Sequence, residues 1–228
     1  MIPRELLGTA AIPGGGELRL VRRGDEFSIM LGANELMSSR LSGSEEALAT
    51  LVAERLAGRR KPRILIGGLG MGFTLRAALA RFPADAEIVV AELVPGVVDW
   101  ARGELSALFA ASLDDPRVDL RIADIAALLA EGRGTCDAVL LDVDNGPDGL
   151  TVEANDDLYR AGGLAAARRA LRPGGVLAVW SSGPDARFTV RLRQAGFAVE
   201  EKSVPASTRK RGARHVIWLA TRPAAAPD

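Results

Sequence analysis

The sequence has few of the residues that support disulfide-linked or metal-stapled folds. Its 228 residues include a single cysteine, Cys136, and a single histidine, His215. One cysteine excludes a disulfide within the chain and any multi-cysteine metal site. No apolar run approaches the roughly 18 to 20 residues that span a bilayer, and the N-terminus lacks a signal peptide's basic start and apolar core. These absences predict a cytoplasmic protein with no structural metal and no membrane partner.

An excess of charge of one sign is also missing. Lysine plus arginine and aspartate plus glutamate both total 29, so the formal net charge is +0 at pH 7. A chain without a net field does not recruit a polyanion, so we expect no nucleic-acid partner. The length suits one sizeable domain with a small appendage.

Residues 1–43 carry the pattern of a small β-hairpin appendage. Apolar and polar residues alternate on both sides of Gly24-Asp25, which is typical of two strands joined by a tight turn. Four apolar side chains would form one exposed face of this hairpin: Leu18, Leu20, Phe27 and Ile29. A two-stranded unit is marginally stable alone, so we expect this face to contribute to a homodimer.

Residues 44–222 alternate between compact apolar runs and longer segments with helical period. A helix capped by Ser44 and stopped by Gly58 is expected first. Strands are expected at 63–66, 87–91, 118–122, 138–141, 176–180, 198–203 and 215–220, and helices at 73–81, 95–111, 125–131, 156–171 and 185–194. This order predicts an α/β fold, a seven-stranded, mostly parallel sheet with helices on both faces and an antiparallel final strand pair. The proline-rich tail, residues 223–228, is expected to be disordered.

A glycine-rich turn follows the first strand of this domain. The run Ile64-Leu65-Ile66 leads into Gly67, Gly68, Gly70 and Gly72, after which a helix begins. Such a turn lets a ligand approach the backbone closely, and the helix N-terminus offers free amide groups. Similar turns also occur without a ligand, so the glycines alone are weak evidence for a nucleotide site.

Acidic residues end the strands that follow this turn. Glu92 stands about 20 residues beyond Gly72, where a carboxylate accepts hydrogen bonds from two vicinal ribose hydroxyls. Asp124 and Asp142 end two further strands, and the carboxyl ends of parallel strands line the ligand crevice of an open α/β sheet. For Asp124, capping of the next helix is an equal alternative. This convergence fits an adenosyl cofactor or a dinucleotide such as NAD.

Several of these stretches resemble the spermidine synthase-like, or polyamine aminopropyltransferase, branch of the S-adenosylmethionine-dependent methyltransferase superfamily. The resemblance covers about residue 17 to about residue 221 and rests on five stretches and Glu92: Ile66-Gly67-Gly68-Leu69-Gly70-Met71-Gly72, Asp115-Pro116-Arg117-Val118, Leu171-Arg172-Pro173-Gly174-Gly175, Glu35-Leu36-Met37-Ser38-Ser39-Arg40 and Ser44-Glu45-Glu46. It implies a Rossmann-like fold and a transferase that moves a methyl or aminopropyl group to a small nucleophilic acceptor.

The resemblance also implies which residues bind the cofactor, S-adenosylmethionine or its decarboxylated form. These residues come from the glycine turn and the strand ends: Gly67, Gly68, Gly70, Gly72, Glu92, Leu93, Asp124, Ile125 and Asp142. An NAD-dependent oxidoreductase, and a homologue that binds the cofactor without turnover, are the alternatives.

The sequence departs from the family's pattern where the acceptor would bind. The family's Asp-Ser/Thr-Ser/Thr-Asp box reads Asp142-Val143-Asp144-Asn145 here, so asparagine replaces the second acid. The family's upstream Glu-Phe-x-Tyr-His-Glu segment is reduced to Ser42-Gly43-Ser44-Glu45-Glu46. A polyamine needs carboxylates along its channel, so we expect little transfer to putrescine.

Asp142, Asp144 and Tyr159 are the candidate catalytic residues. Burial at a strand end would raise the pKa of Asp142, and a second acid at Asp144 would raise it further, which suits a base that deprotonates the acceptor. Asp144 fits a turn-rich loop equally well, and Tyr159 fits a packing residue on a helix face. His215 and Trp180 lie in predicted strands and are expected to be structural.

Overall fold

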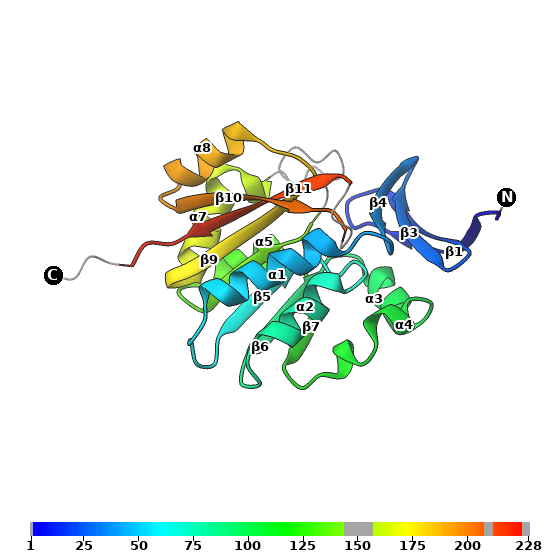
Figure 1. The fold of residues 1–228 in the computed structure, drawn as a ribbon, viewed down its shortest axis with the longest axis horizontal. Coiled ribbons are helices and arrows are strands. Elements are labelled where there is room, and N and C mark those ends of the chain that lie inside the picture. Colours follow the sequence, from blue (N-terminus) through cyan, green and yellow to red (C-terminus); the bar gives the residue numbers. More distant parts are fainter. Residues whose placement is uncertain (1, 144–156, 208–211, 225–228) are drawn as a thin grey trace.

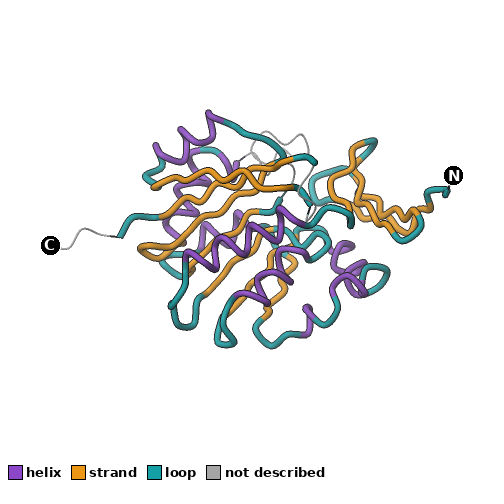
Figure 2. The backbone as a smooth tube through the Cα atoms, in the orientation of Figure 1, coloured by secondary structure: helices purple, strands orange, loops and turns teal. Residues whose placement is uncertain are grey.

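The computed structural model of the protein describes residues 2–143, 157–207 and 212–224. These residues form a seven-stranded sheet of order β10-β11-β9-β8-β5-β6-β7 and a separate four-stranded sheet of order β1-β2-β3-β4. The small sheet lies at one end of the large one, on the side of the N-terminus (Figures 1 and 2).

The large sheet has the predicted architecture. Its strands are β5 (Arg63–Gly67), β6 (Glu87–Glu92), β7 (Val118–Ile122), β8 (Cys136–Leu141), β9 (Leu171–Ser181), β10 (Ala198–Pro205) and β11 (Arg214–Thr221). The central strands pair in parallel, whereas β11 pairs antiparallel with both β9 and β10. The expected fold class is therefore confirmed, and the final strand lies one place in from the edge formed by β10.

Helices cover both faces of this sheet (Figure 1). One face packs against α1 (Gly43–Arg55), α2 (Phe73–Arg81) and α3 (Pro95–Arg102), and the other packs against α5 (Ile125–Glu131), α7 (Ala161–Ala170) and α8 (Ala186–Gln194). Along β5, Ile64 and Ile66 belong to the first core and Leu65 to the second. Because successive strand residues point to opposite faces, a continuous apolar run fills both cores. Within the described part of the chain, no helix has the length and hydropathy needed to cross a membrane.

Two expected helices differ from the observed ones. The segment 95–111 forms α3 and a separate short helix, α4 (Ser106–Phe109), followed by a 3₁₀ turn at Ser112–Asp114, because Gly103 ends α3. The helix expected over 156–171 is observed as a helical turn at 157–159 and, after a break at Arg160, as α7; residue 156 lies outside the described residues. Leu171 begins β9 instead of ending the helix, since it pairs with Cys136 of β8.

The N-terminal appendage is a four-stranded antiparallel sheet and not a hairpin. The predicted hairpin corresponds to β2 (Glu17–Arg23) and β3 (Glu26–Leu31), flanked by β1 (Glu5–Ala11) and β4 (Asn34–Ser38). The outer strands carry adjacent apolar residues, Leu6-Leu7 and Leu36-Met37, in place of strict alternation. Each also pairs with a register shift, so neither has the sequence pattern by which a strand is recognised.

The apolar face of the small sheet is buried within the chain. Leu18, Leu20 and Ile29 are 7%, 0% and 4% exposed and belong to the same core as α3. Gly8 of β1 lies against the Trp100 indole of α3 so closely that a Cβ there would come within 2.8 Å of its Nε1. The expectation of an exposed face on this appendage was therefore wrong.

Candidate active site

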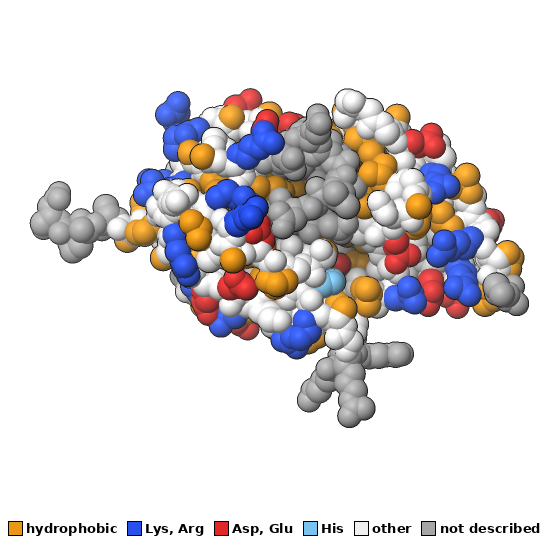
Figure 3. Space-filling view, turned by 90° about the horizontal axis from the view of Figure 1, so that it is seen from above, with side chains coloured by type: hydrophobic (Ala, Val, Ile, Leu, Met, Phe, Trp, Pro, Cys, Tyr) orange, Lys and Arg blue, Asp and Glu red, His pale blue; other side chains and the backbone are white. Residues whose placement is uncertain are grey.

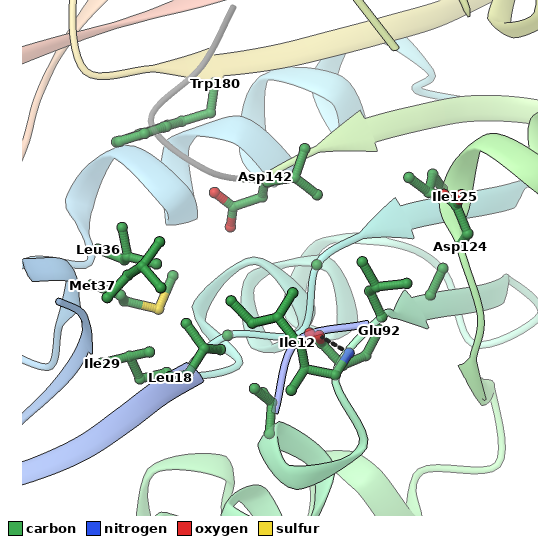
Figure 4. Close-up of a pocket in the computed structure, with 18 of the residues that line it drawn as sticks. Ile12, Leu18, Ile29, Leu36, Met37, Glu92, Asp124, Ile125, Asp142 and Trp180 are labelled. Carbon is green, nitrogen blue, oxygen red and sulfur yellow. Dashed lines mark hydrogen bonds between the residues drawn. The ribbon is translucent and has the colours of Figure 1, made fainter. Parts of the chain in front are cut away.

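A cavity lies at the carboxyl ends of β5, β6, β7 and β8, where the large sheet meets the small one (Figure 4). Most of the predicted cofactor-binding residues line it: Gly68, Gly70, Glu92, Leu93, Asp124, Ile125 and Asp142. The sequence did not point to the opposite wall, which the small sheet supplies with Ile12, Leu18, Ile29, Leu31, Leu36 and Met37. The cavity is thus acidic toward the strand ends and apolar toward the appendage.

Two glycines of the turn have no room for a side chain. Gly68 has φ +90°, and a Cβ there would lie 2.5 Å from the carbonyl oxygen of Asp142. Gly70 has φ +50°, and its Cβ would lie 2.7 Å from the methyl carbon of Met37. Both lie in the cavity wall, as predicted for a turn that a ligand approaches closely.

The other two glycines are outside this wall. Gly67 ends β5 and packs beneath Ile125, whose Cγ1 would be 3.1 Å from an added Cβ. Gly72 is the N-cap of α2 with φ +76°, and its Cβ would lie 2.4 Å from the Phe109 ring. Their positions fit packing and helix initiation, and neither residue lines the cavity.

Glu92 is held rigidly at the end of β6. Its Oε2 accepts a hydrogen bond from the Leu69 amide at 2.9 Å, and its Oε1 accepts one from the Val94 amide at 2.8 Å. Burial raises the pKa of this carboxyl, while the amides of Val94 and Leu69 oppose that rise. The amides of Gly70 and Leu93 oppose it as well, so backbone donors from the glycine turn and from the strand end converge on this carboxylate.

Asp124 caps the helix that follows it and also lies in the cavity wall. Its Oδ1 accepts a hydrogen bond from the Ala126 amide at 2.8 Å and so caps α5. The residue also lines the cavity beside Ile125. Helix capping therefore fixes the orientation of a side chain that borders the nucleoside end of the cavity.

Two carboxyl groups, Asp142 and Glu45, line the same part of the cavity. Asp142 follows β8, and its Oδ2 lies 2.6 Å from the Thr74 hydroxyl, which also lies 3.3 Å from the carbonyl oxygen of Glu45. Burial, and then repulsion from Asp142, raise the pKa of Glu45 to about 7. Burial raises the pKa of Asp142 to about 6 against the opposing hydrogen bond from Thr74. Near neutral pH this pair therefore retains protons that ordinary carboxyls have lost.

Ser44 connects Glu45 to the histidine of the distant strand β11. Its hydroxyl donates to Glu45 Oε2 at 2.6 Å and lies 2.8 Å from His215 Nδ1. The expected capping role of Ser44 was wrong, since α1 begins at Gly43 with Ser42 as its N-cap. The His215 ring also meets the Trp180 ring edge-to-face, with centroids 4.8 Å apart.

Trp180 and Glu45 were not among the site residues predicted from the sequence. Trp180 and Glu45 line the cavity, and Figure 4 shows Trp180 beside the Asp142 carboxyl. The one signal in the sequence was Glu45 itself, an acid in the first turn of a helix that precedes the buried Leu48 and Val52. Nothing in the sequence indicated that His215 reaches this helix.

Tyr159, one of the predicted catalytic residues, is not among the described residues that line the cavity. Tyr159 is buried, its ring meets Phe188 edge-to-face at 5.7 Å, and its hydroxyl donates to the Val143 carbonyl at 3.3 Å. This placement supports the packing role weighed for it. Asp144 and Asn145 lie outside the described residues.

The cavity wall contains no cationic side chain among the residues that the structure describes. In the same residues, no group of three or more histidine, cysteine, aspartate or glutamate side chains is placed to hold a metal ion. The seven-stranded sheet, the glycine turn and the acidic strand ends together define an α/β protein with a cavity at the strand ends that is acidic on that side.

Comparisons with known proteins place this architecture more narrowly. A model of the spermine/spermidine synthase domain matches residues 43–186. The polyamine aminopropyltransferase of Mycobacterium tuberculosis is 32% identical over 195 residues, which cover 80% of this chain and 35% of that protein. The polyamine aminopropyltransferase of Nitrosomonas europaea is 33% identical over 137 residues, covering 60% of this chain and 40% of that protein.

Solved structures agree on the fold. Spermidine synthase from Thermotoga maritima superposes with a TM-score of 0.75 at 18% identity, covering 95% of this chain and 72% of that one. A spermidine synthase in complex with the transition state analogue AdoDATO gives the same values.

The chain belongs to the spermine/spermidine synthase domain family. It spans 35% of the length of the mycobacterial relative and 40% of the Nitrosomonas one. The family assignment leaves the NAD-dependent oxidoreductase alternative without support.

Proposed function

We propose that this chain binds decarboxylated S-adenosylmethionine and transfers its aminopropyl group to a small amine. The observation that carries the proposal is the pairing of Glu45 with Asp142 in a cavity wall whose described residues include no lysine or arginine. The carboxylate of S-adenosylmethionine would need a cationic or amide partner there. The decarboxylated cofactor presents only an ammonium group, which two carboxyls favour. Methyl transfer from S-adenosylmethionine is therefore the weaker alternative.

The nucleoside end of the cavity fits the remaining part of this cofactor. Glu92 lines the cavity where a carboxylate can accept the ribose hydroxyls, and the backbone at Gly68 and Gly70 lets the sulfonium end lie against the turn. Asp124 and Ile125 border the place left for the adenine. Relatives of this chain carry the name polyamine aminopropyltransferase, which is consistent with this assignment.

The reaction requires that the acceptor nitrogen be aligned with the aminopropyl carbon and that it lose one proton. The acceptor nitrogen attacks the aminopropyl carbon bound to sulfur, the C–N bond forms, and the C–S bond breaks with its electron pair passing to sulfur. Asp142, raised in pKa and held by Thr74, is the group placed to take the acceptor's proton. Glu45 adds a second carboxyl group, which lies on α1 and not in the acidic box that follows β8.

The chemistry of the cavity wall indicates which kind of acceptor amine fits. The two carboxyls lie together, so they favour one ammonium region rather than two charges spaced along a channel, and the small sheet adds an apolar surface. Asn145 stands where the family has its second acid, although its position lies outside the described residues. We therefore retain the expectation of weak transfer to putrescine and expect an amine with an apolar body to serve better.

Calorimetric titration tests the cofactor half of this proposal. Decarboxylated S-adenosylmethionine and methylthioadenosine should bind, S-adenosylmethionine should bind at least about 10-fold more weakly, and NAD should not bind. Tighter binding of S-adenosylmethionine than of its decarboxylated form would contradict the assignment. Release of methylthioadenosine with a panel of amines then tests turnover, and binding without release from any amine would identify a homologue that has lost the reaction.

We further infer that the chain acts in the cytoplasm as a homodimer. The free edge of the small sheet, strand β1, supports the assembly, since Leu6 on it is 57% exposed and an unpaired edge strand readily pairs with another chain. Light scattering at micromolar concentration checks this, and a monomer mass would count against it.

A further inference from the structure

We infer that Glu45, Ser44 and His215 form a proton relay that carries the proton released at Asp142 from the cavity to the protein surface. The relay rests on the proposed transfer reaction for the source of its proton. Its hydrogen-bond chain rests on the structure alone and can be tested without any substrate.

The Ser44 hydroxyl is the centre of this chain. It lies 2.6 Å from Glu45 Oε2 and 2.8 Å from His215 Nδ1, and both distances are those of good hydrogen bonds. A hydroxyl donates one hydrogen, so the two bonds must run in the same direction. In one state His215 donates to Ser44 and Ser44 donates to Glu45. In the other state Glu45 donates to Ser44 and Ser44 donates to His215, and passing between the states moves one proton along the chain.

The two ends of the chain lie in different surroundings. Ser44 and Glu45 are buried, and Glu45 lines the cavity close to Asp142. His215 is partly exposed, and histidine atoms appear at the surface in Figure 3, in a chain that has one histidine. The relay therefore joins a buried carboxyl in the cavity wall, Glu45, to a ring that solvent reaches.

The groups around the relay shift the pKa values of the residues at its two ends. Three groups lie near Glu45: Asp142 at the end of β8, Glu46 in α1 and the uncharged Thr74 in α2. His215 packs against the uncharged Trp180 ring of β9. Burial and the repulsion from Asp142 raise the pKa of Glu45 to about 7, while burial lowers the pKa of His215 below its usual value. Glu45 therefore holds a proton near neutral pH and can supply it to the chain.

The proton balance of the reaction shows how many protons the relay must carry. An acceptor that arrives as an ammonium ion loses one proton to Asp142, its nitrogen displaces the neutral thioether, and the product amine stays protonated. One proton per turnover must therefore leave the pair formed by Asp142 and Glu45. Glu45 donates it to Ser44 as Ser44 donates to His215 Nδ1, and the imidazolium ring releases a proton from Nε2 to solvent.

The first experiment reads the hydrogen-bond chain by nitrogen-15 NMR of the imidazole ring, which needs no assignment because His215 is the only histidine. As pH rises through the titration of Glu45, the neutral ring should change from the Nε2–H tautomer to the Nδ1–H tautomer. Glu45→Gln and Ser44→Ala should abolish this change, whereas Glu46→Gln, a matched loss of the neighbouring acid, should keep it. A wild-type ring that keeps one tautomer across the range would overturn the relay.

The second experiment reads turnover. Ser44→Ala and His215→Ala should lower kcat about 10-fold or more near neutral pH, with the dissociation constant of methylthioadenosine within about twofold of wild type. Imidazole in the buffer should restore His215→Ala, whereas His215→Phe, which keeps a ring against Trp180, should stay slow. Unchanged kcat in His215→Ala, or full activity in His215→Phe, would overturn the relay. If no amine is alkylated by the wild type, the transfer reaction fails and the relay with it, while the tautomer measurement still decides whether the hydrogen-bond chain exists.

Discussion

Replacing Glu92 is the most direct test of the cofactor site. In the structure its two carboxylate oxygens accept the backbone amides of Leu69 and Val94, and the residue lines the cavity where the ribose of the ligand would lie. Glu92→Gln keeps the shape but turns one acceptor oxygen into an NH₂ group, so one backbone amide and one ribose hydroxyl lose their acceptor. Hydrogen bonds to a charged group contribute about 1.5 to 3 kcal/mol each. Losing the one made to the ligand should weaken methylthioadenosine binding by about 10- to 150-fold.

The assay is calorimetry with two ligands, methylthioadenosine and its 2′-deoxy analogue. Wild type should prefer the full ribose, and this preference should shrink in Glu92→Gln, because the acceptor and the hydroxyl are partners in the same interaction. A loss of affinity that is equal for both ligands would point to a disordered turn at Leu69. Unchanged affinity for methylthioadenosine would refute the ribose assignment.

Three further predictions follow from individual contacts. Gly68→Ala should lower the free energy of unfolding by about 2 kcal/mol or more in denaturant titrations, because its Cβ would lie 2.5 Å from the Asp142 carbonyl, whereas Gly162→Ala in α7 meets nothing within 4 Å and should be neutral or stabilising. Asp142→Asn should lower kcat about 10²- to 10⁴-fold while leaving the dissociation constant of methylthioadenosine nearly unchanged, and full activity would remove it as the base. Glu45 binds a proton more tightly in the folded chain, where its pKa is about 7, than in the unfolded chain, so its contribution to stability is present at pH 4 and lost as pH rises through 7. Glu45→Gln should therefore gain stability relative to wild type by about 2 kcal/mol between pH 5 and pH 8, and a constant difference would contradict the raised pKa.

Much of the nucleoside half of the site could be predicted from the sequence. The apolar run of β5, the glycines after it and Glu92 at the end of β6 all lie within one strand-turn-helix-strand unit. In such a unit local geometry dictates position, because a strand followed by a glycine turn and a helix returns the chain to the same sheet edge. The carboxyl ends of parallel strands then bring Asp124 and Asp142 to that edge.

The acceptor half depended on contacts between distant parts of the chain. Ser44 and His215 are 171 residues apart in sequence, and their hydrogen bond exists only because β11 lies near the start of α1 in the folded chain. The same packing turned Ser44 from the expected helix cap into the partner of Glu45.

The sequence by itself determined the succession of strands and helices, the glycine turn and the acids at the strand ends, because short-range patterns of period, turn and spacing decide these features. Only the tertiary structure decided that the N-terminal strands close the cavity and that Glu45 stands beside Asp142. A carboxyl changes its proton affinity through burial and through a neighbouring charge, and both of these arise only when separate elements pack together.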